Sequence, residues 1–290
     1  MSEGDRKWLT ERQTEGTLFS LEVKRWLERR RTKYQLLELA ETRDHGRALA
    51  LDEKFMLTER DEFFYHEMLV HPALLSHREP KKVLIVGGGD GGALREVLKH
   101  PSVEEAFLVE IDEEVIEASR RHLPSVHFGA FDDPRARVVV APGEEFVKGR
   151  RGEFDAVIVD SPDPVGPGRR LFEPEFYAFC RLALRPGGVM ALQAGTPFYW
   201  PDLLTKILGA LKNLFPIVRV YLGFVPTYPS GMWAYVLTGL RDFYVEEERI
   251  PQRFEERKIE TRYYTPEVHK AAFALPRFIA ELVERALARD

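Results

Sequence analysis

Short apolar runs that alternate with amphipathic stretches restrict the fold of this chain more than any other feature. The runs are rich in Val, Ile and Leu and cover residues 83–86, 106–109, 138–140, 156–159 and 189–192. Helical spacing is found between them, over residues 93–100, 113–122 and 173–184. Buried strands that alternate with helices are typical of a largely parallel sheet covered by helices on both faces. We therefore predict a Rossmann-like, methyltransferase-type α/β domain over residues 78–290.

The end of this domain has its own signals. Residues 218–221 and 233–237 favour two strands that close the sheet as a hairpin. Thr265 followed by Pro266 is a typical helix start, because Thr can cap the first turn and Pro is tolerated there. A single last helix is expected from about Pro266 onward.

The N-terminal part of the chain has shorter, strand-like patterns. Polar breaks separate three candidate strands, at residues 33–41, 48–51 and 55–57, and this favours hairpins. Between residues 61 and 77 the apolar spacing changes to that of a helix, and Pro80 follows as a boundary signal. We predict a small β-rich N-terminal domain over residues 1–77.

Composition excludes several classes of protein. The charged residues make up 31% of the chain but leave a net charge of only -5, which does not favour a nucleic-acid partner. Cys180 is the single cysteine, so a disulfide framework is excluded. No apolar run approaches the roughly 18 residues that cross a bilayer, and an apolar signal segment is missing, so we expect a cytoplasmic protein without a membrane partner. Scarce Asn and Gln beside many Arg and Glu are typical of a thermophile.

The strongest local motif is a glycine loop that follows the first of these apolar runs. Gly87-Gly-Gly-Asp90-Gly-Gly joins a buried strand to a helix, and its glycines allow a tight turn and close approach of a ligand. Glu110 ends the next strand about 20 residues later, where an acid usually binds ribose hydroxyls. Asp112 is expected to cap the helix that follows. Together these residues predict a nucleoside site at the carboxyl ends of the strands.

Asp90 argues against a dinucleotide in that site. A pyrophosphate would lie at the helix N-terminus, and a carboxylate in the loop would repel it. A positively charged nucleoside fits better. Decarboxylated S-adenosylmethionine, which has an ammonium and a sulfonium but no carboxylate, fits best. The alternative is that Asp90 only caps the helix.

A second acidic motif follows the strand over residues 154–160. Asp160 ends that strand, and Asp163 follows in a Pro/Gly-rich loop that should face the same crevice as Asp90. Alternatively, both are simply turn-forming residues. Phosphate-loop, HExxH and Ser–His–Asp patterns are missing and the histidines are scattered, so no metal site is expected. The basic run at residues 29–33 is interpreted as solvated surface.

These motifs resemble the spermidine synthase (polyamine aminopropyltransferase) family over nearly the whole chain. The similar segments are residues 33–35, 58–68, 87–92, 110–112, 160–167, 171–172, 226–231, 263–264 and 268–276. The resemblance implies transfer of an aminopropyl group from decarboxylated S-adenosylmethionine, a co-substrate, to an amine, with release of methylthioadenosine. It implies putrescine as the default acceptor, with agmatine and longer polyamines open. It also implies no further cofactor and a homodimer or homotetramer.

The resemblance also assigns roles by motif position. Asp160 would accept the proton of the attacking amine, with Tyr65 beside it. Donor-binding residues would be Gln35, His66, Gly87, Asp90, Glu110, Gly143 and Pro167. Acceptor-binding residues would be Tyr65, Asp163, Gln193 and Tyr228.

Three positions depart from the family pattern. Pro142 replaces an Asp that usually contacts adenine, Met56 replaces a frequent Gln, and Pro162 replaces Ser or Thr. Glu144 or backbone groups could contact adenine instead. Two other functions remain open, a methyltransferase that uses intact S-adenosylmethionine and a nucleoside-binding protein without activity.

Overall fold

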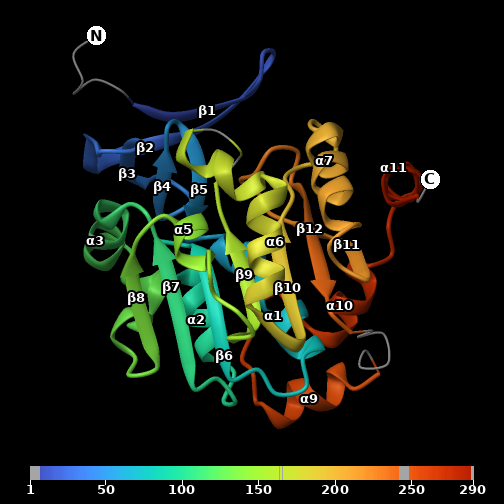
Figure 1. Cartoon of the computed structure of the whole chain (residues 1–290). Coiled ribbons are helices and arrows are strands. Elements are labelled where there is room, and N and C mark those ends of the chain that lie inside the picture. Colours follow the sequence, from blue (N-terminus) through green and yellow to red (C-terminus); the bar gives the residue numbers. More distant parts are fainter. Residues whose placement is uncertain (1–6, 163, 165, 242–247, 289–290) are drawn as a thin grey trace.

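A computed structural model describes residues 7–162, 164, 166–241 and 248–288, and it contains two sheets (Figure 1). The N-terminal sheet is antiparallel and has its five strands in chain order. Its strands are β1 (Trp8–Thr14), β2 (Thr17–Arg31), β3 (Leu36–Thr42), β4 (Arg47–Leu51) and β5 (Lys54–Thr58). The β-rich N-terminal unit is therefore present, and its 15-residue β2 is longer than the short strands that were predicted.

The second sheet has seven strands in the order β11-β12-β10-β9-β6-β7-β8. The bounds are β6 (Lys82–Gly87), β7 (Glu105–Glu110), β8 (Ala136–Val140), β9 (Phe154–Asp160), β10 (Leu184–Gln193), β11 (Ile217–Phe224) and β12 (Met232–Gly239). Strands β10, β9, β6, β7 and β8 are parallel, and the β11–β12 hairpin is antiparallel to β10. This order confirms the predicted Rossmann-like domain and its closing hairpin.

Helices cover both faces of the larger sheet (Figure 1). The helices of the described residues are α1 (Glu62–Ser76), α2 (Gly92–Leu98), α3 (Glu113–His122), α4 (Pro124–His127), α5 (Gly143–Val147), α6 (Pro174–Ala183), α7 (Pro201–Leu211), α9 (Ile250–Glu256), α10 (Pro266–Ala272) and α11 (Arg277–Leu287), with short 3-10 helices η2 (Ala130–Asp132) and η3 (Gly166–Phe172). One apolar core forms between the sheet and α1 and α2, and another forms on the side of α6 and α7.

Two predicted helix caps are confirmed, and the predicted length of the last helix is wrong. The side chain of Asp112 accepts a hydrogen bond from the Glu114 amide at the start of α3. Thr265 accepts one from the Val268 amide at the start of α10. The chain then forms two helices instead of one, with Pro276 at the N-cap of α11. Pro lacks an amide donor and disfavours helical backbone in the residue before it, so α10 cannot continue through this position.

Helix α1 packs with the larger sheet. Almost all of its residues are buried, and Met68, Leu69 and Leu74 belong to the same core as Ile85 of β6. The phenol of Tyr221 on β11 donates a hydrogen bond to the Met68 carbonyl at 2.8 Å. We therefore propose that the boundary between the units lies between β5 and α1, earlier than the predicted one after residue 77.

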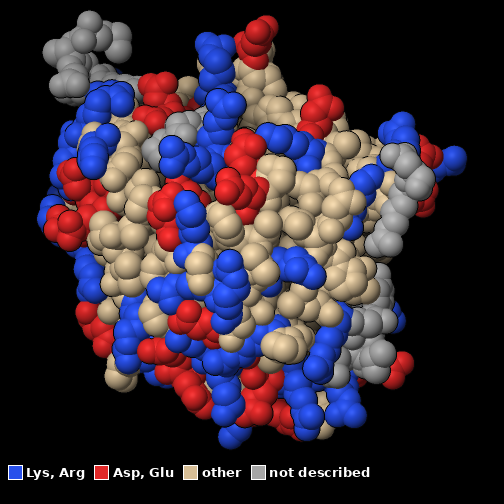
Figure 2. Space-filling view, viewed as in Figure 1, with Lys and Arg blue, Asp and Glu red and all other residues tan. Residues whose placement is uncertain are grey.

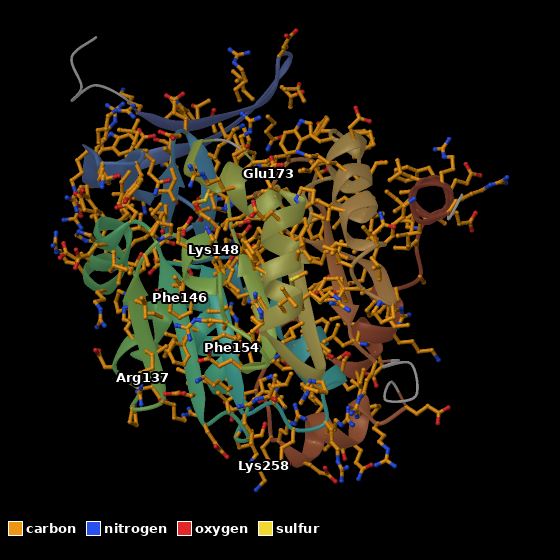
Figure 3. The ribbon with its side chains drawn as sticks, in the orientation of Figure 1. Arg137, Phe146, Lys148, Phe154, Glu173 and Lys258 are labelled. Atoms are coloured by element: carbon orange, nitrogen blue, oxygen red, sulfur yellow. The ribbon has the colours of Figure 1, made fainter. Side chains whose placement is uncertain are left out.

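The amino ends and the carboxyl ends of the strands in the larger sheet carry different kinds of side chain. Phe154, labelled in Figure 3, lies at the amino end of β9. Its ring packs edge to face on that of Phe107, with ring centroids 5.8 Å apart. The guanidinium of Arg150 lies 3.9 Å from the centre of the Phe146 ring. Aromatic and cationic side chains thus pack together here, while the polar residues of the predicted site lie at the carboxyl ends of the strands.

Charge on the surface is mixed. Lys and Arg side chains are interspersed with Asp and Glu over the face drawn in Figure 2. In the basic run, Arg29 pairs with Glu38 at 2.9 Å and Arg30 pairs with Glu28 at 2.5 Å. Across the part of the chain that is described, no helix is both long and apolar enough to traverse a bilayer.

Candidate active site

Three adjoining cavities form one groove along the carboxyl ends of β6, β7, β9 and β10. The central cavity is lined by Tyr65, His66, Asp90, Glu110 and Asp160 among others. Glu110 and Pro162 also line a second cavity, the Gln35 cavity, which adjoins the central one on one side. Tyr65 and Tyr228 line both the central cavity and a third one, the Trp233 cavity.

Asp160 lies at the centre of the groove, at the end of β9. The Tyr65 phenol donates a hydrogen bond to its Oδ1 at 2.8 Å. Its buried Oδ2 has no hydrogen-bond partner among the described residues. Burial, with help from the charge of Asp90, raises the pKa of Asp160 to about 6, although His66 and the Tyr65 hydrogen bond oppose this rise. A buried acceptor without a partner is unusual and is available to an N–H group of a ligand.

His66 lies between two carboxylates. Its Nδ1 is 2.7 Å from Glu62 Oε2, and its Nε2 is 3.2 Å from Asp90 Oδ1. Burial works against a charged ring, but Asp90 and Glu62 raise the pKa of His66 well above its usual value. Two carboxylates that face the two ring nitrogens favour an N–H donor at each nitrogen, which is the imidazolium form of His66.

Asp90 has two roles in the local structure. Its Oδ1 accepts a hydrogen bond from the Gly92 amide at 2.7 Å, so the alternative that it holds the start of α2 is observed. It also lines the central cavity. Burial opposes ionisation, but His66 and the Gly92 amide lower the pKa of Asp90. A single carboxylate therefore stabilises the loop and presents negative charge to the groove.

Among the described residues, His66, Asp90 and Asp160 form a group that geometry would allow to hold a metal ion, with ligand atoms within 4.8 Å of one another. A metal would have to displace a proton from a ring nitrogen that faces Glu62 or Asp90, because only a deprotonated nitrogen is a ligand. The absence of a metal from the mechanism stays a prediction.

The glycine loop is needed for close packing of the site residues themselves. Gly88 has a φ of +73°, and a Cβ there would lie 2.8 Å from Asp160 Oδ2. A Cβ on Gly87 would lie 2.1 Å from the Asp160 carbonyl oxygen, and one on Gly92 would lie 2.3 Å from the His66 ring. The loop thus carries glycine where acidic and imidazole side chains approach the backbone.

Gly92→Ala is expected to lower the free energy of unfolding by about 1–3 kcal/mol, because its Cβ would displace the buried His66 ring. Thermal unfolding measures the effect. Gly209→Ala in α7 is the matched control, since a Cβ there meets nothing within 4 Å and removing a helical glycine should stabilise by up to about 1 kcal/mol. Equal unfolding temperatures for Gly92→Ala and the wild type would contradict this packing.

The Gln35 cavity contains the remaining predicted donor residues whose side chains are described. Burial raises the pKa of Glu110 to about 7, and its Oε1 accepts a hydrogen bond from the Asp112 amide at 2.9 Å. The Gln35 amide donates to Asp112 Oδ2 at 3.0 Å, so it ties the N-terminal sheet to the end of β7. Gly87 and Gly143 line this cavity, and so does Glu144.

The Trp233 cavity is lined by Tyr65, Gln193 and Tyr228, three of the four acceptor residues that the resemblance implied. Gln193 Nε2 donates to the Ser161 carbonyl at 3.1 Å, and its Oε1 accepts from the Gly195 amide at 2.8 Å. Gln193 therefore braces the loop after β9. The Tyr228 phenol donates to the Met56 carbonyl, and its ring centroid lies 4.6 Å from that of Trp233.

Two of the predicted site residues, Asp163 and Pro167, cannot be placed in the groove by their side chains. Asp163 lies outside the described residues, and Pro167 lies in η3. Sequence reasoning missed Glu11 and Lys54, which line the Trp233 cavity with Nζ and Oε1 3.3 Å apart. Glu11 lies on β1 and Lys54 on β5, so their contact could be predicted only if the positions of both strands in the sheet were known. The sequence patterns did not reveal β1 as a strand.

Sheet order and groove define a Rossmann-like α/β protein with an acidic crevice at the carboxyl ends of its strands. A family model described as spermine/spermidine synthase domain matches residues 62–245, and one described as spermidine synthase tetramerisation domain matches residues 7–59. The chain belongs to the spermine/spermidine synthase family.

Individual relatives agree with this assignment. The polyamine aminopropyltransferase of Caldicellulosiruptor saccharolyticus is 44% identical over 279 residues, which cover 96% of this chain and 98% of the relative. That of Bacillus mycoides is 45% identical over 277 residues, covering 96% and 99%. A crystal structure of a spermidine synthase in complex with the transition state analogue AdoDATO has a TM-score of 0.92 and 43% identity, covering 98% of this chain and 95% of that chain. The spermidine synthase of Thermotoga maritima has a TM-score of 0.89 and 41% identity, covering 98% and 94%.

Proposed function

We propose that this protein transfers the aminopropyl group of decarboxylated S-adenosylmethionine to putrescine, giving spermidine and methylthioadenosine. The observation that carries the proposal is the buried Oδ2 of Asp160, which has no partner among the described residues and lies in an acidic cavity that also contains Asp90. Relatives named polyamine aminopropyltransferase and spermidine synthase support it.

The donor nucleoside would occupy the Gln35 cavity. Glu110 accepts hydrogen bonds from the ribose hydroxyls, and its carboxylate lies between this cavity and the central one. With Pro142 at the position of the usual Asp, Glu144 and the backbone near Gly143 are the groups that contact adenine. The aminopropyl ammonium then lies beside Asp90.

The reaction needs no covalent enzyme intermediate. The lone pair of the acceptor nitrogen forms a bond to the carbon beside the sulfonium, and the electrons of the breaking C–S bond remain on sulfur as the thioether of methylthioadenosine. The nitrogen loses one proton, which Asp160 Oδ2 accepts. Tyr65 holds Oδ1, so the other oxygen is directed to the amine. Holding both substrates in line makes the step effectively unimolecular.

The rate should depend on the ionisation of Asp160. Because a base must be deprotonated, kcat/KM for the donor is expected to rise with pH through about 6 and to level off above. Tyr65→Phe removes a hydrogen bond that favours the carboxylate, so the acidic limb should shift to higher pH. Initial rates between pH 5 and 9 measure this. A limb that shifts to lower pH in Tyr65→Phe would contradict the assigned base.

Product analysis tests the function itself. Wild-type protein with decarboxylated S-adenosylmethionine and amines of graded length is expected to release methylthioadenosine, with putrescine the preferred acceptor. Mass spectrometry identifies each amine product. Methylated products from intact S-adenosylmethionine would favour the methyltransferase. No product with any amine would favour a nucleoside-binding protein.

We also propose a homo-oligomer joined through the N-terminal sheet. The match to a tetramerisation domain over residues 7–59 supports this, as do Trp8 and Leu18, which are 50% and 57% exposed on β1 and β2. Light scattering on the purified protein is expected to give twice or four times the single-chain mass, and a single-chain mass would contradict it.

A further inference from the structure

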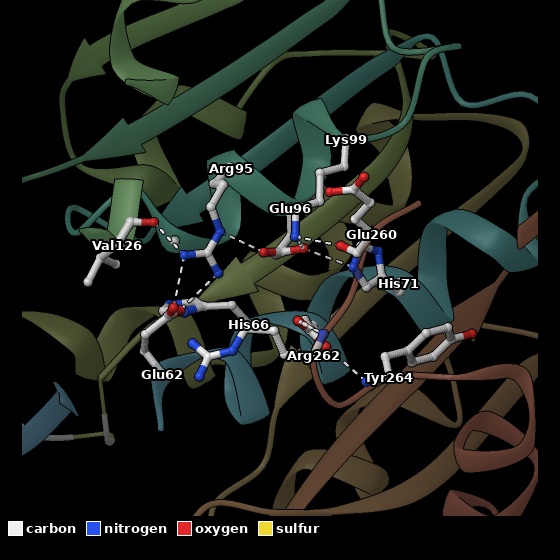
Figure 4. Close-up of polar contacts among 12 residues, drawn as sticks. Glu62, His66, His71, Arg95, Glu96, Lys99, Val126, Glu260, Arg262 and Tyr264 are labelled. Atoms are coloured by element: carbon white, nitrogen blue, oxygen red, sulfur yellow. Dashed lines mark hydrogen bonds and ion pairs between the residues drawn. The ribbon is translucent and has the colours of Figure 1, made fainter. Parts of the chain in front are cut away.

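A chain of buried charges runs from the groove into the protein behind it, and Figure 4 shows the part that includes Glu62, Arg95 and Glu96. It begins at Asp90 and His66 and continues through Glu62, whose two oxygens each lie 2.9 Å from a terminal nitrogen of Arg95. The side chains of His66 and Glu62 are 2% and 4% exposed. Since the charges alternate in sign, each ion is stabilised by its neighbours in a region that excludes water.

The chain continues beyond Arg95 toward the surface. Arg95 Nε is 2.6 Å from Glu96 Oε1, and Glu96 Oε2 is 2.9 Å from His71 Nε2 and 2.8 Å from Lys99 Nζ. Lys99 is the most exposed of these side chains, at 29%. Arg95 is thus fixed from both sides, and its two terminal nitrogens hold Glu62 in one orientation.

The orientation of Glu62 influences the protonation state of His66. Glu62 Oε2 accepts a hydrogen bond from Nδ1–H, and its negative charge favours the imidazolium, in which Nε2–H faces Asp90 Oδ1 at 3.2 Å. The other titratable side chains at His66 are Tyr65 on α1, whose ring centroid lies 5.3 Å away, and Asp160 on β9. A positive ring therefore lies close to both the Asp90 and the Asp160 carboxylates, with ligand atoms of the three residues within 4.8 Å of one another.

We propose that Glu62, oriented by Arg95, is a positioning residue that keeps His66 doubly protonated against Asp90 and thereby sets the pH at which Asp160 becomes an active base. The inference rests on the proposed function, because it assigns Asp160 the role of base. Glu62 itself touches neither substrate, so its effect is transmitted through the imidazolium. The positive ring favours the carboxylate form of Asp160, in agreement with its opposing effect on the pKa of that group.

Glu62→Gln tests the proposal. The amide keeps the shape of the side chain but removes the charge, so His66 should lose its proton more readily and Asp160 should hold its proton to higher pH. The acidic limb of kcat/KM for the donor is expected to move about one pH unit upward, a tenfold change in proton affinity. Glu62→Asp, which retains the charge, should recover at least part of this shift.

Two measurements separate this effect from a loss of folded protein. A loss of active enzyme that is the same at every pH lowers the plateau without moving the limb, and circular dichroism at each pH shows whether the variant unfolds in acid. Lys99→Met is the matched control, because it removes a charge from the far end of the chain without contacting Glu62 or His66. Its acidic limb should coincide with that of the wild type.

Nitrogen-15 spectra of histidine-labelled protein give a readout that needs no turnover. The His66 signals, assigned with His66→Gln, should remain those of an imidazolium to a higher pH than those of an ordinary histidine in the wild type, and should become neutral at lower pH in Glu62→Gln than in the wild type. An unchanged limb together with unchanged His66 signals in Glu62→Gln would overturn the inference. Failure of the wild type to release methylthioadenosine would instead refute the proposed function, while the spectra would still test the state of His66.

Discussion

Asp160→Asn is expected to reduce kcat by about 10²–10⁴-fold, the usual contribution of a positioned general base. Asn keeps the shape of the side chain and can still accept the Tyr65 hydrogen bond at Oδ1, but it cannot take a proton from the amine. The fit of the nucleoside in the Gln35 cavity should be preserved. Methylthioadenosine affinity is therefore expected to change by less than about threefold.

Asp155→Asn is the matched control for this variant. Asp155 is a buried carboxylate at the other end of β9, where its Oδ2 accepts hydrogen bonds from the amides of Lys81 and Lys82. Its replacement should lower thermal stability with little effect on kcat of the folded enzyme. Steady-state rates and calorimetric methylthioadenosine binding measure both variants, and near wild-type kcat in Asp160→Asn would refute the assigned base.

Asp90→Asn should weaken binding of decarboxylated S-adenosylmethionine by about 10- to 150-fold, the range that corresponds to losing a hydrogen bond between charged groups. Asn can still accept the Gly92 amide bond that stabilises the loop, so the effect reports on the charge. Methylthioadenosine has no aminopropyl ammonium. Its affinity is expected to change by less than about threefold.

Calorimetric titration of the two nucleosides into the wild type and Asp90→Asn gives the comparison. Glu145→Gln removes the same charge from an exposed position on α5, so it controls for the net charge of the protein. Equal losses of affinity for both nucleosides in Asp90→Asn would show that Asp90 supports the loop and does not contact the ammonium.

The sequence predicted the larger sheet better than the smaller one. Strands β6, β7 and β9 are buried on both faces, so their apolar runs are visible without any knowledge of the partner strands. Strand β2 has few buried residues and no regular alternation, because it is stabilised mainly by pairing with β1 and β3. The length of such a strand depends on tertiary pairing, which a local pattern does not contain.

The candidate site was predictable where it depends on strand ends. Asp160 ends β9 and Glu110 ends β7, and these two parallel strands lie on either side of β6. Asp90 lies in the loop after β6, so the sheet topology alone brings the three acids together. The pairing of His66 with Glu62 and Arg95 was not predictable, because α1 and α2 approach each other only in the folded core. The hydrogen bonds of the Gln35 amide to Asp112 and of the Gln193 amide to the Ser161 carbonyl were likewise not predictable from the sequence.

The proposed function requires that the acidic groove binds a cationic nucleoside in preference to one that also carries a carboxylate. The most direct measurement is the affinity of the wild-type protein for decarboxylated and intact S-adenosylmethionine at one pH and ionic strength. The two differ only in the carboxylate, which Asp90 should repel, so the account predicts at least tenfold tighter binding of the decarboxylated form. Equal affinities, or tighter binding of the intact form, would contradict it.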